Sequence, residues 1–99
     1  MAIGLITRFP EVMGAEQYDS VNEKLNMAGE APEGLILHCA GELDGRFQVF
    51  DIWETRAHHD RFADGRLREA IIGVIGEEAY AELPDAERVE TEIHSYVIP

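Results

Sequence analysis

The segment LILHCAGELDGRFQVFDIW, residues 35–53, decides the fold of this 99-residue chain. At its centre lies Asp44-Gly45, a residue pair that favours the two-residue turn of a β-hairpin, in which both positions need a positive φ. The flanks are rich in apolar, β-branched and aromatic residues and predict two antiparallel strands. Neither flank alternates cleanly between apolar and polar residues, so both faces of the resulting sheet are expected to be buried.

Apolar periodicity and turn residues predict the elements on either side of this hairpin. Pro10 and Pro84 mark two of the boundaries, and Thr55 is suited to cap the second helix. The predicted elements are strands over 2–9, 35–42, 46–54 and 87–98, helices over 15–28 and 56–78, and one further helical turn over 79–83. Right-handed crossovers fold this β-α-β-β-α-β order into a ferredoxin-like α+β domain, with a four-stranded antiparallel sheet and both helices on one face.

The second copy of the chain is the first partner that this pattern predicts. Two helices cover one face of a sheet, whereas the central strands look apolar on both faces. The other face therefore needs a cover, and an identical sheet supplies one. A homodimer is expected, with residues 1–99 forming a single domain in each copy.

Charge and composition exclude several other partners. The chain has 8 basic and 20 acidic residues, a net charge of −12, which repels phosphate backbones and anionic membranes. No apolar run approaches the roughly 20 residues of a membrane span, and no signal-peptide pattern opens the chain. Cys39 is the only cysteine, which excludes an internal disulfide and a cysteine-rich zinc site. These features predict a cytoplasmic protein without metal.

The motif Asp51-Ile52-Trp53-Glu54-Thr55-Arg56, followed by Phe62 and preceded by the strand end Thr7-Arg8-Phe9, resembles a known family. It is similar to the dimeric α+β barrel superfamily, and within it to the antibiotic-biosynthesis-monooxygenase-like proteins. The resemblance implies two ferredoxin-like sheets packed into a barrel. It also implies a range of activities, including cofactor-independent oxygenation of aromatic polyketides, haem degradation, isomerisation and decarboxylation.

Carrying the resemblance over by residue implies three substrate-binding positions: Trp53, Thr7 and Phe62. Trp53 matches the tryptophan that ends the third strand in many members. Thr7 and Phe62 stand where haem-degrading members have an asparagine and a tryptophan. Their axial histidine falls near Ile72, which cannot ligate iron, so the resemblance implies no haem and no other cofactor. The strand asparagine of the oxygenases has no counterpart here.

The hairpin register places two polar residues face to face. With a two-residue turn, His38 lies opposite Asp51 and Ile36 lies opposite Trp53, with Cβ atoms of each pair about 5 Å apart. The Asp51 carboxylate can orient the His38 imidazole and raise its basicity, which makes His38 a candidate catalytic base. The alternative is that the pair only satisfies two buried polar groups and holds the hairpin register.

The other histidines give weaker indications. His58 and His59 point about 100° apart on a helix, so they cannot share a metal, and His59-Asp60 is expected on a solvated face. We therefore expect a homodimer that binds a small apolar or aromatic molecule between sheet and helices. Its activity would be cofactor-independent oxygenation or proton transfer, and the alternative is a non-catalytic binding or accessory protein.

Overall fold

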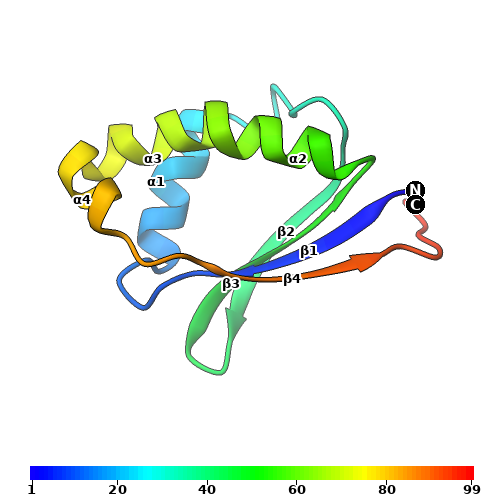
Figure 1. Ribbon diagram of the computed structural model, residues 1–99, viewed down its shortest axis with the longest axis horizontal. Coiled ribbons are helices and arrows are strands. Elements are labelled where there is room, and N and C mark those ends of the chain that lie inside the picture. Colours follow the sequence, from blue (N-terminus) through cyan, green and yellow to red (C-terminus); the bar gives the residue numbers. More distant parts are fainter.

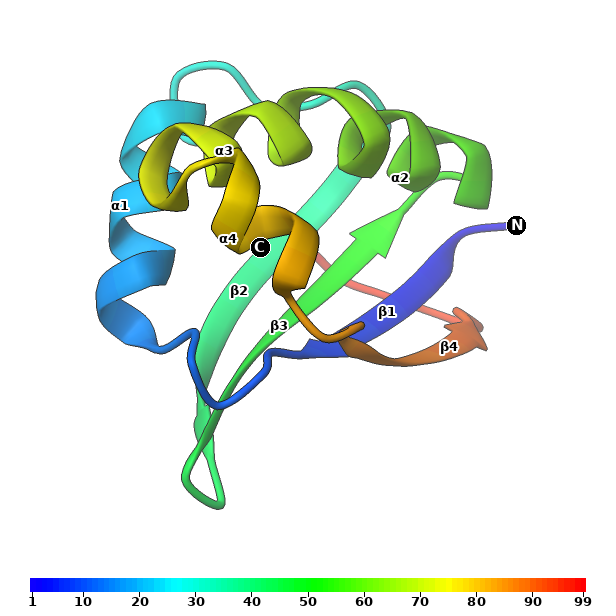
Figure 2. The ribbon, with the colours of Figure 1, turned by 60° about the vertical axis from the view of Figure 1, so that its left-hand side comes forward.

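A four-stranded antiparallel sheet forms one layer of the molecule, and the helices pack over one of its faces (Figures 1 and 2). The computed structural model describes all 99 residues. The strands are β1 (Ile3–Arg8), β2 (Leu35–Leu43), β3 (Arg46–Trp53) and β4 (Glu87–Glu92), and the helices are α1 (Ala15–Leu25), α2 (Arg56–Phe62), the π-helical turn η1 (Ala63–Leu67), α3 (Arg68–Ile75) and α4 (Glu77–Glu82). The sheet order β2-β3-β1-β4 confirms the predicted ferredoxin-like fold.

The β2–β3 hairpin has the predicted turn. Asp44 and Gly45 both have positive φ values, 55° and 77°, and His38 pairs directly with Asp51. The register is irregular between Leu35 and Leu37, so Trp53 pairs with Leu35. The predicted pairing of Trp53 with Ile36 is therefore wrong. A bulge at the start of β2 adds one residue to that strand, which a turn-based register cannot foresee.

The second helical segment runs on from α2 through η1 into α3. Thr55 caps its start, with its hydroxyl oxygen accepting a hydrogen bond from the backbone N–H of His58 at 3.2 Å. It ends at Gly76, whose φ of 89° cannot continue a helix. From this segment Phe62, Leu67, Ile71 and Val74 pack against the buried residues Val21, Leu25 and Ala70.

The last strand is shorter than predicted. β4 ends at Glu92, opposite Ile3, the first residue of β1, and the expected continuation to residue 98 is wrong. One further backbone bond joins the N–H of Ile93 to the carbonyl of Ala2. Alternation alone predicted a longer strand. A strand also needs a hydrogen-bonded neighbouring strand, and β1 begins at Ile3, opposite Glu92.

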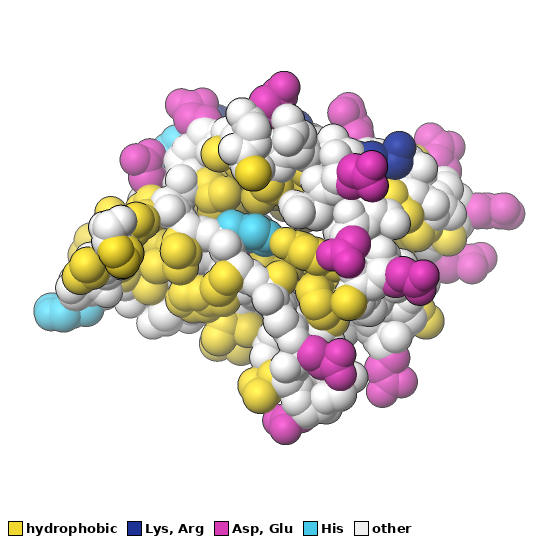
Figure 3. All heavy atoms as spheres, turned by 180° about the vertical axis from the view of Figure 1, so that it is seen from behind, with side chains coloured by type: hydrophobic (Ala, Val, Ile, Leu, Met, Phe, Trp, Pro, Cys, Tyr) yellow, Lys and Arg dark blue, Asp and Glu magenta, His cyan; other side chains and the backbone are white.

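The sheet face away from the helices is apolar. Ile6 pairs with Phe50 on one side and with Val89 on the other, and directly paired residues share a face. Val89 is 59% exposed and Leu37, on β2, is 37% exposed. In the view from behind, hydrophobic side chains gather in the lower part of the molecule, where the sheet lies below the helices (Figure 3). We call the sheet face that carries Ile6, Phe50, Val89 and Leu37 the open face. No helix of the chain has the length and apolar character that crossing a membrane requires.

Candidate functional site

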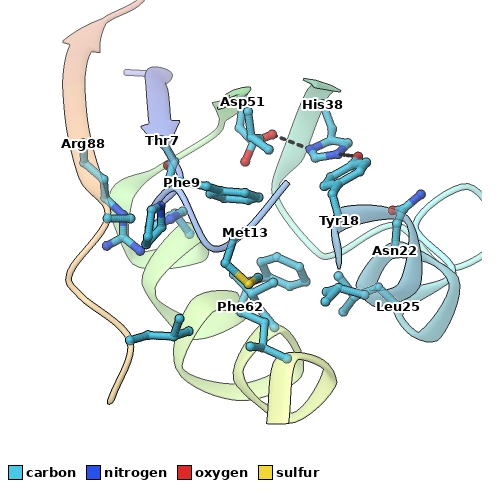
Figure 4. Close-up of a pocket in the computed structure, with 18 of the residues that line it drawn as sticks. Thr7, Phe9, Met13, Tyr18, Asn22, Leu25, His38, Asp51, Phe62 and Arg88 are labelled. Carbon is cyan, nitrogen blue, oxygen red and sulfur yellow. Dashed lines mark hydrogen bonds and ion pairs between the residues drawn. The ribbon is translucent and has the colours of Figure 1, made fainter. Parts of the chain in front are cut away.

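A continuous hydrogen-bonded chain of three side chains joins α1 to the central hairpin (Figure 4). Nδ1 of His38 lies 2.6 Å from Oδ1 of Asp51, and Nε2 of His38 lies 2.6 Å from the hydroxyl oxygen of Tyr18. An ionised carboxylate only accepts, so Nδ1–H donates to Asp51. In the neutral imidazole Nε2 is then an acceptor, and the Tyr18 hydroxyl donates to it.

Tyr18, His38 and Asp51 meet because α1 packs over the face of the sheet to which β2 and β3 direct the other two side chains. The hairpin register aligns His38 with Asp51 on the helix-covered face of the sheet. Tyr18 lies three residues before Val21 on the buried side of α1, and its ring packs against Phe47 with centroids 4.9 Å apart. The side chains of His38 and Asp51 are only 20% and 14% exposed, so solvent weakens their interaction little.

Tyr18 holds its proton firmly. Burial raises the pKa of its hydroxyl, and the negative charge of Asp51 raises it further. Both effects oppose formation of a phenolate. At neutral pH Tyr18 therefore keeps its proton and is a hydrogen-bond donor to His38.

A cavity of about 160 Å³ lies between the sheet and the helices beside this chain of side chains. Tyr18, His38 and Asp51 all line it, together with apolar residues from the sheet and the helices such as Val49, Leu25 and Phe62. Of its 20 lining residues 12 are hydrophobic. A largely apolar cavity with a few converging polar groups is the usual form of a small-molecule site.

Two of the three residues expected to contact a substrate line this cavity, and one does not. Thr7 and Phe62 are lining residues. Trp53 is completely buried and lies outside the lining, with its indole against His59 and Phe62 at centroid distances of 5.7 and 5.5 Å. Trp53 therefore packs behind two residues that line the cavity, His59 and Phe62, and does not itself face the cavity. Trp53 ends β3, shortly before the capping residue of α2, and there it packs against His59 and Phe62 of that helix.

The π-helical turn η1 shapes the wall opposite the sheet. In a regular α-helix, residues five apart point about 140° away from each other. The wider turn of η1 reduces this angle, and both Phe62, just before η1, and Leu67, its last residue, line the cavity. Arg66 joins this turn to the end of α1 and the loop that follows it, because its guanidinium donates to the carbonyls of Leu25 and Glu30 at 2.8 and 2.9 Å.

His59 differs from its predicted setting. It is only 5% exposed and lines the cavity, so the expected solvated face is wrong at this position. Its Nδ1 lies 3.1 Å from Asp60, which also accepts from Arg56 at 3.0 Å. The hydrogen bond from Arg56, and then that from His59, lowers the pKa of the Asp60 carboxyl. The reason for the burial is Trp53, whose indole packs edge to face on the imidazole.

The remaining candidate groups lie apart from the cavity. Cys39 is exposed, and its thiol donates to the carbonyl of Phe50 at 3.6 Å; strand alternation places it on the sheet face opposite His38. No cluster of three or more His, Cys, Asp or Glu side chains is arranged to hold a metal ion.

Solved structures of small oxygenase-like proteins have the same architecture. The chain matches a provisionally assigned antibiotic biosynthesis monooxygenase from Chloroflexus aurantiacus over 100% of both chains, with a TM-score of 0.62 and 15% identity. It matches a variant of SnoaB, a cofactor-independent oxygenase from Streptomyces nogalater, over 97% of this chain and 96% of that one, with a TM-score of 0.59 and 13% identity. The chain shares their fold.

A third match bears on assembly. A dimeric ferredoxin-like protein of unknown function from Thermobifida fusca covers 94% of this chain and is itself covered to 92%, with a TM-score of 0.60 and 19% identity. No protein-family model and no curated protein sequence matches the chain. At these identities the likeness is one of fold, and it confirms the predicted resemblance at that level.

Proposed function

We propose that this protein binds a small apolar or aromatic molecule in the cavity between sheet and helices and removes an acidic proton from it. The observation that carries the proposal is the chain Tyr18–His38–Asp51, which ends at an otherwise apolar cavity. A base that is oriented by a carboxylate and sheltered from bulk water is the arrangement that proton abstraction needs.

Tyr18 gives the proposed step its geometry. Its hydroxyl already occupies Nε2 of His38, so a ligand meets the phenol before it meets the imidazole. The ligand's proton passes to the Tyr18 oxygen as the Tyr18 proton passes to Nε2. Tyr18 is then neutral before and after the transfer, which suits a group whose pKa burial has raised. Asp51 stabilises the imidazolium that results.

The ligand anion left in the cavity defines the reaction class. Reprotonation at another atom gives an isomerisation, and reaction of the electron-rich anion with O2 gives a cofactor-independent oxygenation. The fold likeness to SnoaB supports the second outcome, and both begin with the same proton transfer. We assign His38 as the base, Asp51 as the residue that orients it, and Tyr18 as the relay, with Thr7 and Phe62 as substrate contacts.

The active form in this proposal is a homodimer. The open face presents Ile6, Phe50 and Val89 to solvent, an arrangement that a second sheet would cover. The dimeric description of the Thermobifida fusca protein supports the same assembly. The cavity lies on the helix-covered side, so covering the open face leaves it accessible.

The alternative is a binding protein without chemistry. It is favoured by the fact that Tyr18, His38 and Asp51 hydrogen-bond to one another, as the members of a purely structural network also would.

Solvent exchange of a bound carbon acid separates the two functions. The probe is 2-tetralone in D2O, and proton NMR measures how fast its acidic C–H is replaced by deuterium. We expect exchange above the buffer rate with the wild-type protein, and a loss of at least about tenfold in His38→Ala. The matched control is His94→Ala, which removes an exposed histidine outside the cavity and should exchange at the wild-type rate. Binding seen by thermal shift without exchange would favour the binding protein.

A further inference from the structure

We propose that the cavity contains an anion subsite, formed by Arg88 and Thr7, and that its ligands are single-ring aromatic carboxylates. This inference deepens the proposed function, on which it rests, by naming the ligand class. It begins from a feature that proton abstraction does not use: an arginine at the end of the cavity away from His38 and Tyr18 (Figure 4).

Arg88 and Thr7 are neighbours by register. They pair directly across β4 and β1, so their side chains leave the sheet on the same face, and both line the cavity. The Thr7 hydroxyl has no hydrogen-bond partner within the protein, and Arg88 makes neither a hydrogen bond nor an ion pair with its side chain. Together they offer up to five N–H donors and one O–H donor to a ligand.

The missing ion pair of Arg88 is notable in a chain with 20 acidic residues. Its neighbours on β4 are occupied: Glu90 accepts from Arg56 at 2.6 Å, and Glu87 pairs with Arg46 at 3.3 Å. Neither carboxylate neutralises Arg88. The guanidinium therefore remains available for an anion from outside the protein.

The two ends of the cavity have opposite charge. Arg88 is the only Lys or Arg that lines it, and Asp51 is the only Asp or Glu. Asp51 repels an anionic group from the His38 end and is already engaged there. The net charge of −12 disfavours anions at long range, but salt screens that field over about 8 Å, whereas a direct guanidinium contact is short. A carboxylate is therefore oriented towards Arg88, and the ligand's acidic proton towards Tyr18.

The size of the cavity limits the body of the ligand. An engineered apolar cavity of about 150 Å³ takes up benzene. The cavity here, at about 160 Å³, matches one ring, and it is lined by aromatic and aliphatic groups such as Phe9 and Phe62. Guanidinium recognises carboxylate through two parallel hydrogen bonds, so a carboxylate is the anion that suits Arg88 best.

The test compares 4-hydroxyphenylacetate with its methyl ester, which has the same ring and hydroxyl but no charge. Isothermal titration measures the affinity of both probes for the wild-type protein, for Arg88→Gln and for Arg61→Gln. Arg61 is a suitable control because it is exposed on α2 and does not line the cavity. We expect Arg88→Gln to weaken acid binding by about tenfold or more and ester binding by less than about twofold. Arg61→Gln should change neither.

Two outcomes overturn the subsite, and they separate it from the proposed function. If acid and ester bind the wild type equally, or Arg88→Gln weakens both alike, the cavity binds aromatic molecules but has no anion subsite. If neither probe binds, the proposed ligand class is wrong, and deuterium exchange into 2-tetralone decides separately whether the proposed function stands. Salt dependence on the unmodified protein gives a second readout: added NaCl should weaken acid binding and leave ester binding unchanged.

Discussion

Gly34 lies directly against the imidazole of His58, in a left-handed backbone conformation with φ of 85°. A Cβ atom at position 34 would overlap the ring of His58. The same corner is fixed by two hydrogen bonds: Glu54 N–H donates to the Gly34 carbonyl at 2.8 Å, and His58 Nδ1 lies 2.7 Å from the Thr55 hydroxyl. The start of β2 is thereby joined to the junction of β3 and α2.

Gly34→Ala should lower the free energy of unfolding by about 1–3 kcal/mol, because alanine disfavours a positive φ and its methyl group displaces His58. Urea denaturation measures the change. The control is Gly41→Ala on the edge strand β2, where nothing lies near the added Cβ and φ is not positive. That variant should be as stable as the wild type or slightly more so. Equal stability of the two variants would contradict this account of the corner.

Tyr18 should make stability fall at alkaline pH. Its pKa is raised in the folded protein, mainly by burial, so the folded state holds the proton more tightly than the unfolded state. This contribution is complete below the unfolded pKa of about 10 and is lost as the pH rises through the higher folded value. Urea denaturation between pH 9 and 12 should therefore show a decline in stability that Tyr18→Phe reduces.

The phenolate absorbance gives an independent reading of the same group. The chain has 3 tyrosines, and the raised pKa of Tyr18 should give the titration a late phase. A wild-type titration that lacks a late phase, or a late phase that persists in Tyr18→Phe, would show that the hydroxyl is not buried as described.

Asp51→Asn tests the residue that orients His38. The amide keeps the shape and removes the charge, so one contact of a largely buried network becomes imperfect and stability should fall by about 1–3 kcal/mol. If the network is catalytic, deuterium exchange into 2-tetralone should fall far more than this loss of folded protein explains. Asp85→Asn, at an exposed position, should change neither quantity. Exchange that survives in Asp51→Asn would leave the pair a structural role only.

The open face predicts the mass in solution. At micromolar concentration, sedimentation equilibrium should give twice the chain mass of 11.1 kDa, with an interface that buries more than about 1,000 Å². Ile6→Glu places a charge between Phe50 and Val89 and should give monomers. Val12→Glu is the control, because Val12 is 68% exposed but precedes α1, outside the sheet, and the dimer should persist. A wild-type mass near 11.1 kDa would refute the assembly.

The parts of the site that sequence could predict are those fixed by short-range rules. Asp44-Gly45 determines the turn, the turn determines the register, and the register brings His38 opposite Asp51. The face that these residues occupy follows from strand alternation. Each step depends on neighbours within one hairpin, which is why the amino-acid sequence alone suffices to locate this pair.

The rest of the site depends on packing between distant elements. Tyr18 lies 20 residues from His38 and appears in the sequence only as one apolar-stripe residue of an amphipathic helix. The available signal was that a buried tyrosine hydroxyl needs a partner. Burial of His59 depends on Trp53, whose indole packs against its imidazole. The bulge that pairs Trp53 with Leu35 has no signal among the turn residues. Arg88 reaches the cavity through pairing of β4 with β1, the contact most distant in the chain.

The π-helical turn also affects how this chain is aligned with others. A π turn contains one residue more than an α turn, so in a relative with a regular helix the positions after η1 correspond to residues shifted by one. The position matched to an axial histidine by resemblance, Ile72, lies beyond that turn. Shifting it in either direction gives Ile71 or Gly73, and neither can ligate iron. The expectation that this protein does not hold haem through that helix is therefore the same under every such alignment.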